Sequence, residues 1–475
     1  MLQLNSYMNR RYLRWFFINL KKEMIPFKFL LVRKNKEKKR LVFTARIKRL
    51  YFTIFILLML QAGFLQYLLR GDYNLEHIII FFASLIILAN LKIFYVLVSN
   101  TINIPFEKLI ARYYIKSAKK IIKSHKNLLV IGITGSYGKT STKYILNKML
   151  SERFNVLMTP ESYNTTMGVV RTIRESLKVS HQIFIAEMGA KEKGDIKEIC
   201  DLVSPKHGII TSIGPQHLET FKTIETIIDT KFELAEALEH DGIAFLNFDN
   251  TYIRQRNFQG NFVKYTTSFN ENLGIKYWSE NIKYDSQGLS FNFCGKEKKQ
   301  ISLKTKLLGR HNVLNIVAAA ALATELGVLP HQIQYAVKRL NPVPHRLELK
   351  SMQGGTIVID DAYNSNPEGA NEAINVLNSF KDYKKILITP GLIELGEKED
   401  ECNFSLGKKA GECADYVILV GENNTIHLQK GVKEVCKNDD KMFVAKNLQE
   451  GLNCLDDVRD EKSVVLFLND LPDNY

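Results

Sequence analysis

The residues best suited to chemistry form a glycine-rich loop, "GITGSYGKTS", at positions 132–141. The loop follows "NLLVIGI", a run typical of a strand, and precedes "TKYILNKML", a run typical of a helix. Gly135 and Gly138 allow backbone angles at which successive N–H groups converge on phosphate oxygens. Lys139 supplies a charge for the terminal phosphates, and the Thr140 hydroxyl suits Mg²⁺. The loop predicts a nucleotide phosphate site; a strand–helix turn with chance glycines is the alternative.

Two polar residues follow neighbouring strand-like runs, and a third lies in a helical run. Glu187 ends "IFIAEMG" and His217 follows "HGIITSI", so both fall at the carboxyl edge of the expected sheet, where ligands collect. A carboxylate facing the phosphate loop there predicts a Mg²⁺ ligand, with a solvated strand end as the alternative. Lys231 lies in "DTKFELAEAL", whose other polar residues are mostly acidic. From the residues alone, Lys231 is interpreted as a solvated or ion-paired lysine.

The elements that must position these residues alternate between strand-like and helix-like runs from residue 127 onward, which predicts a doubly wound parallel α/β sheet. Residues 275–310 instead have the pattern of short antiparallel hairpins. A second alternating series begins near 344–346, after "NPVPHRLE". We therefore expect an ATP-binding central domain at 127–345 and a C-terminal domain at 346–475.

The distribution of charge excludes a nucleic-acid-binding body. The whole chain carries a net charge of +15, but residues 1–126 contain 24 Lys and Arg against 5 Asp and Glu. Residues 127–475 contain 41 basic and 45 acidic side chains, so the body is mildly acidic. The 6 cysteines form no CxxC pair, which is typical of reduced thiols in the cytosol. The residues do not indicate an oligomeric state.

Two apolar runs in the N-terminal quarter, 51–69 and 78–98, are long enough to cross a hydrocarbon core of about 30 Å. Lys92 is the one charge in the second run, and it would snorkel to an interface or mark a contact inside the membrane. Basic residues flank both outer ends, so the positive-inside rule places both termini and the catalytic body in the cytoplasm. The alternative is a buried hairpin in a soluble core.

The N-terminal quarter therefore divides into three expected segments, which are a basic cytoplasmic arm at 1–48, a two-helix transmembrane hairpin at 49–99 and a basic amphipathic linker at 100–126. The linker mixes apolar and basic residues at helical spacing, so it would lie along an anionic membrane surface. A plain linker helix is the alternative. Lipids of the inner membrane are the expected partner of this quarter.

Several motifs in the same order resemble the Mur ligase family, the ATP-dependent amide-forming ligases of bacterial peptidoglycan precursors. The loop "TGSYGKTS" looks like that family's variant, with glycines three apart where the usual Walker A pattern places them five apart. The likeness is greatest to the branch that adds D-alanyl-D-alanine. It includes "YNTTMGV" at 163–169, "AEMGAKEKGDIKEICDLVSPKHGIITSIGPQHLETF" at 186–221, "GRHNVLNIVAAAALA" at 309–323 and "DDAYNSNP" at 360–367. It implies a P-loop central domain and a Rossmann-like C-terminal domain.

The resemblance also implies roles for single residues. Lys139 would bind the γ-phosphate, and Thr140 and Glu187 would hold Mg²⁺. His217 would serve a second metal ion, and Lys231 occupies the place of a lysine that the family carbamylates with CO₂. The remaining ATP-binding residues would be Gly135, Ser136, Gly138 and Ser141 in the loop, Asn312 and Asn315 beside the adenine, and Arg346 and Asp361 from the C-terminal domain. Tyr363, Asn364 and Asn366 match the motif without an assigned role.

The implied reaction is ATP-dependent ligation, in which a carboxylate of an envelope precursor becomes an acyl phosphate and is joined to an amino acid or a dipeptide. In place of the family's sugar-binding N-terminal domain stand the basic arm and the hairpin, and "LFLNDLPDNY" stands where a Lys-Gly-Ser segment is usual. Two alternatives remain. One is a membrane-anchored ligase for another envelope polymer, as in poly-γ-glutamate or capsule synthesis. The other is a scaffold that binds ATP without catalysis.

Overall fold

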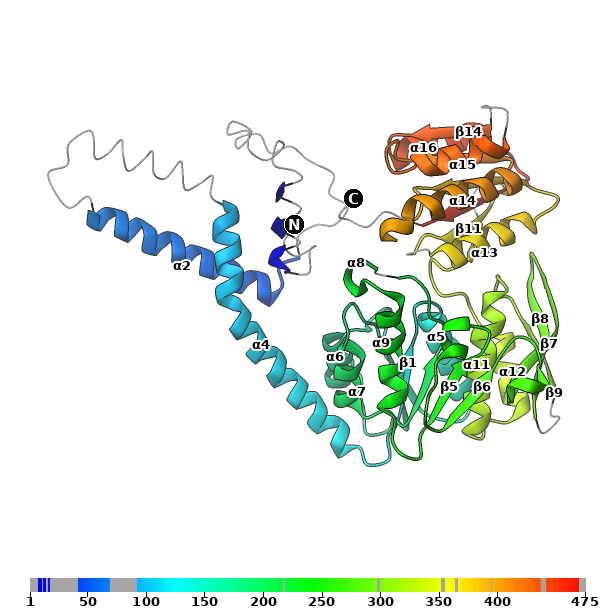
Figure 1. Ribbon diagram of the computed structural model, residues 1–475, viewed down its shortest axis with the longest axis horizontal. Helices are drawn as coiled ribbons and strands as arrows, with labels where there is room; N and C mark the ends of the chain where they lie inside the picture. Colours follow the sequence, from blue (N-terminus) through cyan, green and yellow to red (C-terminus); the bar gives the residue numbers. More distant parts are fainter. Residues whose placement is uncertain are drawn as a thin grey trace. The chain divides into compact units, whose positions relative to one another are not determined.

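The structure is a computed structural model. It describes residues 7–10, 12–13, 16–17, 42–68, 92–216, 218–296, 300–351, 355–363, 366–393, 395–436 and 441–469. The chain forms two compact units, Met1–Tyr114 with Leu471–Tyr475, and Ile115–Asp470. The second unit contains two separate sheets with their helices (Figure 1).

The sheet of the central domain has the strand order β2-β3-β1-β4-β5-β6-β7-β8-β9. Its strands are β1 Leu129–Thr134, β2 Val156–Met158, β3 Ile183–Glu187, β4 His207–Ile210, β5 Ile243–Asn247, β6 Phe262–Tyr265, β7 Tyr277–Asp285, β8 Gly288–Gly295 and β9 Gln300–Thr305. Pairings from β2 through β7 are parallel, whereas β7, β8 and β9 pair antiparallel. The doubly wound sheet and the inserted hairpins are thus confirmed.

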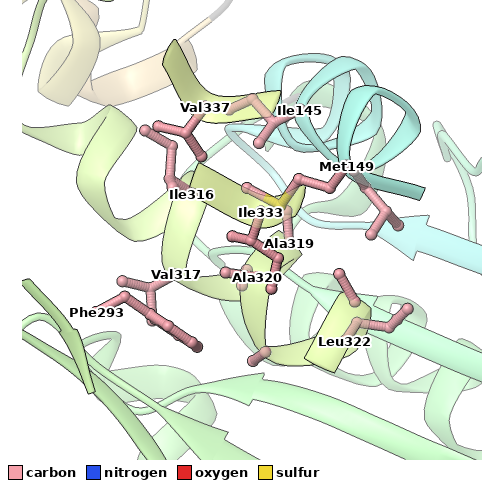
Figure 2. Packing of buried hydrophobic residues seen from close by; sticks show 14 of the residues in the cluster. Ile145, Met149, Phe293, Ile316, Val317, Ala319, Ala320, Leu322, Ile333 and Val337 are labelled. Atoms are coloured by element: carbon pink, nitrogen blue, oxygen red, sulfur yellow. The ribbon is translucent and has the colours of Figure 1, made fainter. Parts of the chain in front are cut away.

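Helices cover both faces of this sheet. They are α5 Lys139–Leu150, α6 Thr166–Ser176, α7 Asp195–Val203, α8 Leu218–Phe221, α9 Ile224–Glu236, α10 Thr251–Gln255, α11 His311–Glu325 and α12 Pro330–Lys338, with the 3₁₀ turn η2 Glu271–Leu273. Ile145 of α5, Ile316 of α11 and Ile333 of α12 meet in one core, which also contains Phe293 of β8 (Figure 2). The alanine run of α11 is fully buried, because small side chains let α5 and α12 pack closely against it. This core fixes α5, which follows the phosphate loop, and α11, which carries Asn312 and Asn315.

The C-terminal sheet has the order β10-β11-β15-β12-β13-β14, and only the β10–β11 pair is antiparallel. Its strands are β10 Glu348–Ser351, β11 Ile357–Asp361, β12 Lys384–Thr389, β13 Tyr416–Val420, β14 Met442–Ala445 and β15 Ser463–Leu468. The helices are α13 Pro367–Asn378, α14 Glu399–Cys413, α15 Ile426–Val435 and α16 Leu448–Val458, with η3 Gly396–Lys398. This arrangement matches the expected Rossmann-like domain.

In the N-terminal unit, α2 Ala45–Leu68 contains most of the first apolar run. Among the described residues, Ala45–Phe64 is the one stretch with the length and apolar composition of a membrane span, with a mean hydropathy of 1.5. Residues 78–91 of the second run lie outside the described residues, so the two-helix hairpin stays a prediction.

The remainder of the second run belongs to α4, Lys92–Ser124, which continues without a break into the expected linker. The change from apolar to basic composition near residue 100 therefore does not mark the end of a helix. The helix α4 also continues through Pro105, although a proline inside a helix removes one backbone hydrogen bond.

Candidate functional site

The phosphate loop connects the end of β1 to the start of α5 with glycines where side chains do not fit. Gly135 has φ 149°, and a Cβ atom there would lie 2.1 Å from Thr211 Oγ1. Gly138 has φ 79°, in the left-handed region, and a Cβ atom there would lie 2.7 Å from Asn315 Oδ1. The sequence therefore needs glycine at both positions for reasons of shape.

Hydrogen bonds fix this loop to the segment that follows β4. Ser136 N–H donates to Ser212 O at 2.6 Å, and the Ser136 hydroxyl donates to Gly214 O at 3.0 Å. The Tyr137 hydroxyl donates to Pro215 O at 2.7 Å. The loop after β1 and the segment after β4 are therefore held together by these hydrogen bonds. His217, expected a few residues further on, lies outside the described residues.

Lys139 is curled over the loop. Its Nζ donates to Gly135 O at 2.7 Å and to Ser136 O at 3.1 Å. Burial among protein groups lowers the pKa of Lys139 to about 8, the Glu187 carboxylate opposes this shift, and the Arg346 guanidinium adds to it. The ammonium is therefore held where the oxygens of a bound phosphate would meet it.

The pKa of Lys139 predicts how ATP binding depends on pH. The side chain is cationic below its pKa and neutral above it, so the attraction to phosphate is present near pH 7 and is lost as the pH rises through about 8. We expect the Kd for ATP, measured by isothermal titration calorimetry, to increase across that interval. A Lys139→Arg variant should bind ATP with little change there, because arginine keeps its charge.

Glu187 lies at the end of β3 beside Ile133 of β1, because the two strands pair in parallel. Its carboxylate is 1 % exposed, and Oε1 accepts from the Thr140 hydroxyl at 3.1 Å and from Asn164 Nδ2 at 3.2 Å. Oε2 lies 3.0 Å from Lys143 Nζ but accepts no well-aligned hydrogen bond among the described residues. A buried carboxylate next to a threonine hydroxyl offers the hard oxygen ligands that Mg²⁺ prefers, and in this structure the Lys143 ammonium balances its charge.

Lys143 and Asn164 were not singled out from the sequence. Lys143 is completely buried, its pKa is lowered chiefly by burial, and its Nζ also donates to Glu161 O. The spacing of four residues from Lys139 along α5 was the available signal, since it places both ammonium groups on one face of the helix. Asn164 belongs to "YNTTMGV", one of the motifs that carry the family resemblance. No feature of the neighbouring sequence indicates its contact with Glu187.

Lys231 of α9 is 2 % exposed, so its interpretation as a solvated lysine is wrong. Burial lowers the pKa of Lys231 well below the usual lysine value, and the nearby Lys139 ammonium lowers it further. Asp195 and Glu233 act in the opposite direction. The structure thus brings Lys139, Thr140 and Glu187 to one edge of the sheet, and Lys231 lies close enough to Lys139 for the two charges to interact.

A cavity of about 680 Å³ adjoins the phosphate loop. Ser141, Asn312 and Asn315 line it from the central domain, and Arg346 and Asp361 line it from the C-terminal domain. The Thr142 hydroxyl donates to Asn315 Oδ1 at 3.1 Å, and Asn315 Nδ2 donates to Asn312 Oδ1 at 3.1 Å. This chain of hydrogen bonds orients both amides. Gly138, Ser141, both asparagines, Arg346 and Asp361 thus line one cavity of a size suited to a small ligand, and the rest of the phosphate loop adjoins it.

The C-terminal domain contacts the central domain through two hydrogen bonds made by residues that line this cavity. The Arg346 guanidinium lies 5.2 Å from the Tyr363 ring centroid, and the Tyr363 hydroxyl donates to Ser162 Oγ at 3.1 Å. Glu372 of α13 accepts a hydrogen bond from Arg310 N–H, at the start of α11. Asn366 caps α13 through Gly369 N–H at 2.9 Å, and Asn364 lies outside the described residues.

A second group of charged residues lies at the start of the C-terminal sheet. Ligand atoms of His345, Glu348 and Asp360 approach within 4.8 Å of one another. The Lys350 ammonium contacts Asp360 and lies 3.0 Å from Glu348 Oε2, so it already balances both carboxylates. This group is an ion-pair cluster beside the interdomain connection.

The chain is similar to known proteins along most of its body. A model of the Mur ligase middle domain matches residues 133–323, and a model of the Mur ligase glutamate ligase domain matches residues 345–468. The UDP-N-acetylmuramoyl-tripeptide–D-alanyl-D-alanine ligases of Bacillus subtilis and Escherichia coli are each 29 % identical, over 58 % and 64 % of this chain. The chain spans 59 % of the length of the first relative and 67 % of the second.

Solved structures agree with the fold. The MurF ligase of Thermotoga maritima in complex with ADP superposes with a TM-score of 0.67 at 25 % identity, over 76 % of this chain and 80 % of that one. MurF from Acinetobacter baumannii has a TM-score of 0.68 at 24 % identity, over 77 % and 78 % of the two chains.

Proposed function

Because the chain belongs to the Mur ligase family, we propose that it is an ATP-dependent, ADP-forming ligase that joins an amine to a carboxylate of a cell-wall precursor. One observation carries the proposal. Lys139 and the Thr140–Glu187 pair lie at the phosphate loop, whose Gly138 and Ser141 line a cavity that both domains enclose, and the Lys139 charge acts on the buried Lys231. The named relatives support D-alanyl-D-alanine as the amine and a UDP-N-acetylmuramoyl tripeptide as the carboxylate.

The proposed reaction has two steps. The acceptor carboxylate attacks the γ-phosphorus of ATP, the bond to the β-phosphate oxygen breaks, and an acyl phosphate and ADP result. The amine then attacks the acyl carbon, loses a proton and expels phosphate, which leaves an amide. Lys139 opposes the negative charge that develops on the transferred phosphoryl group. Thr140 and Glu187 would hold Mg²⁺, which supplies charge neutralisation and orientation of the phosphates when bound.

Lys231 has a separate part in the proposal. Its amine is buried and has a lowered pKa, so a neutral form is accessible that can add CO₂ and release a proton. The resulting carbamate would convert a cation beside Lys139 into an anion. Such an anion, together with His217, would hold a second metal ion, as the family resemblance implies.

Contacts between the domains keep water from the acyl phosphate in this proposal. The Tyr363–Ser162 hydrogen bond and the Glu372–Arg310 hydrogen bond join the C-terminal domain to the central domain at residues that line the cavity, namely Tyr363, Arg310 and Glu372. A closed cavity matters because water would hydrolyse the acyl phosphate before the amine reacts.

Removing the Tyr363 hydroxyl tests this closure. Tyr363→Phe loses one hydrogen bond, so kcat/KM is expected to fall by about threefold to tenfold. Ser162→Ala should have a similar effect, and the double variant should lose little more, because both changes remove the same contact. Additive losses in steady-state ADP formation would contradict a shared role.

The proposed enzyme acts at the cytoplasmic membrane, with its catalytic domains on the cytoplasmic side. What supports this location is α2, which exposes large apolar side chains around its surface, among them Phe52, Phe55, Leu60 and Phe64. A helix that is apolar on every side gains free energy by burial in hydrocarbon. This feature also favours the second candidate, a ligase for a membrane-presented envelope polymer.

The decisive assay uses the purified full-length chain. ADP release should require ATP together with the UDP-linked tripeptide and D-alanyl-D-alanine, and mass spectrometry should detect the amide product. Turnover with another carboxylate or amine supports the second candidate. ATP binding without release of ADP in any substrate combination, including envelope extracts, favours the non-catalytic scaffold.

A further inference from the structure

One exposed face of α4 combines positive charge with large apolar side chains. The basic members are Lys108, Arg112, Lys116, Lys120 and Lys123, and the apolar members are Phe106, Leu109 and Tyr113. At 3.6 residues per turn all eight fall within about 160° of the helix circumference. We call this set the basic face of α4.

The apolar members of the basic face are strongly exposed in the described structure. Phe106 is 57 % exposed, Leu109 is 60 % exposed and Tyr113 is 69 % exposed. Scattered apolar residues on a surface are ordinary, but three within eight residues on one side of a helix form a patch. A helix that only connects two domains needs no such patch.

The acidic residue of α4 does not reduce the charge of this face. Glu107 is paired with Arg49 of α2 through two bonds, Nε–Oε1 at 2.7 Å and Nη2–Oε2 at 2.9 Å. Thr53 of α2 and Asn103 of α4 are likewise hydrogen-bonded to each other, at 3.0 Å. These contacts direct the Glu107–Asn103 side of α4 toward α2 and leave the basic face outward.

The composition of the basic face identifies its partner. Basic side chains interleaved with aromatic and aliphatic ones on one helical face suit the surface of an anionic bilayer, where charges meet headgroups and apolar groups enter the interface. The basic side chains would also suit the phosphates of a nucleic acid, but the apolar Leu109 and Phe106 would not. The apolar α2 belongs to the same unit as the part of this face up to Tyr113, and it favours lipid.

We propose that the basic face of α4 binds anionic phospholipid headgroups, with Phe106, Leu109 and Tyr113 entering the membrane interface. The proposal rests on the membrane location given above, and it adds a preference for lipid charge that insertion of α2 alone does not require. The contact with headgroups would hold α4 along the membrane surface.

Fluorescence quenching of a tryptophan at position 113 tests the proposal. Full-length Tyr113→Trp protein is placed in nanodiscs of brominated phosphatidylcholine, with or without brominated phosphatidylglycerol. The quenching of the added tryptophan, relative to the parent chain, should be at least about twofold greater with phosphatidylglycerol. Tyr335→Trp, on the exposed side of α12, provides a control position and should show no dependence on lipid charge.

Charge reversal separates headgroup binding from insertion. Arg112→Glu, Lys116→Glu and Lys120→Glu, combined with Tyr113→Trp, should remove the effect of phosphatidylglycerol. The matched control Lys304→Glu, Lys306→Glu and Lys430→Glu changes the net charge equally at exposed sites and should retain it. ATP binding by both triple variants verifies that the catalytic body is folded.

Other outcomes overturn the inference in distinguishable ways. Equal quenching in both lipids, with a chain that still needs detergent for extraction, rejects headgroup binding and leaves the membrane location intact. A chain that stays in solution without detergent rejects both. Tight binding of duplex DNA or RNA at physiological salt, lost on charge reversal, would assign the face to nucleic acid instead.

Discussion

Replacing Lys139 with methionine is expected to lower ADP formation by at least about a hundredfold, the scale of losing one preorganised charged group at a reacting centre. The physical reason is the position of Nζ, which lies over the phosphate loop within 2.7 Å of Gly135 O. Charge develops on the γ-phosphoryl oxygens during transfer, and in a partly buried site that charge is not screened by water. Methionine retains the length of the side chain and removes only the charge.

The matched control is Lys178→Met, because Lys178 is exposed and lies outside the cavity. Steady-state ADP release and ATP affinity are measured for both variants, with thermal unfolding as a test of folding. Lys139→Met should unfold at a temperature close to that of the parent, since the unbranched methionine side chain keeps the packing of the lysine stem. A Lys139→Met protein that still releases ADP at more than a tenth of the parent rate would show that the loop does not bind the reacting phosphate.

The sequence predicted the position of Glu187 beside the phosphate loop because the geometry of a parallel sheet follows from general rules. Parallel strands place their carboxyl ends together, so Glu187 had to lie near the loop that follows β1. The glycines of the loop can be read directly from the sequence. The structure explains Gly135, because a Cβ atom there would lie 2.1 Å from Thr211 Oγ1. Fold class and site location were therefore accessible before any coordinates.

The features that the sequence did not predict are contacts between distant segments and the burial of single side chains. Lys143 resembles any helix-surface lysine, and only the packing of α5 against β3 places its ammonium 3.0 Å from Glu187. Tyr363 and Ser162 are separated by 201 positions, so no local pattern relates them. The acidic neighbours of Lys231 suggest a solvated or ion-paired side chain, and they do not reveal its burial, because burial depends on which face of α9 meets the sheet.

The N-terminal quarter shows a different limit. Hydropathy located α2. The expected boundary between the second span and the linker, near residue 100, falls inside the single helix α4, because composition can change along a helix that keeps its backbone hydrogen bonds. The Arg49–Glu107 and Thr53–Asn103 contacts join residues 58 and 50 positions apart. Charge counts alone could not reveal that pairing.

Substituting Lys231 is expected to have an effect comparable to that of Lys139, for a different reason. Lys231→Ala removes the amine that would form the carbamate, and ADP formation should fall at least about a hundredfold, as for loss of a ligand that positions a catalytic metal ion. Lys231→Arg should be equally inactive, because it keeps a cation and cannot form the carbamate. Lys430→Ala, an exposed lysine of α15, is the control and should leave the rate unchanged.

The carbamate makes two further predictions that a structural lysine would not. The parent enzyme should lose activity in buffer depleted of CO₂ and regain it with bicarbonate, and ¹³C-labelled bicarbonate should give a carbamate resonance that Lys231→Ala lacks. Acetate, a small carboxylate able to occupy the vacated space, should partly restore Lys231→Ala. If activity is independent of bicarbonate and no resonance appears, while Lys231→Ala is still inactive and folded, then Lys231 acts as an amine or a cation. In that case burial and the nearby Lys139 ammonium, which both lower the pKa of Lys231, would serve to keep its amine neutral.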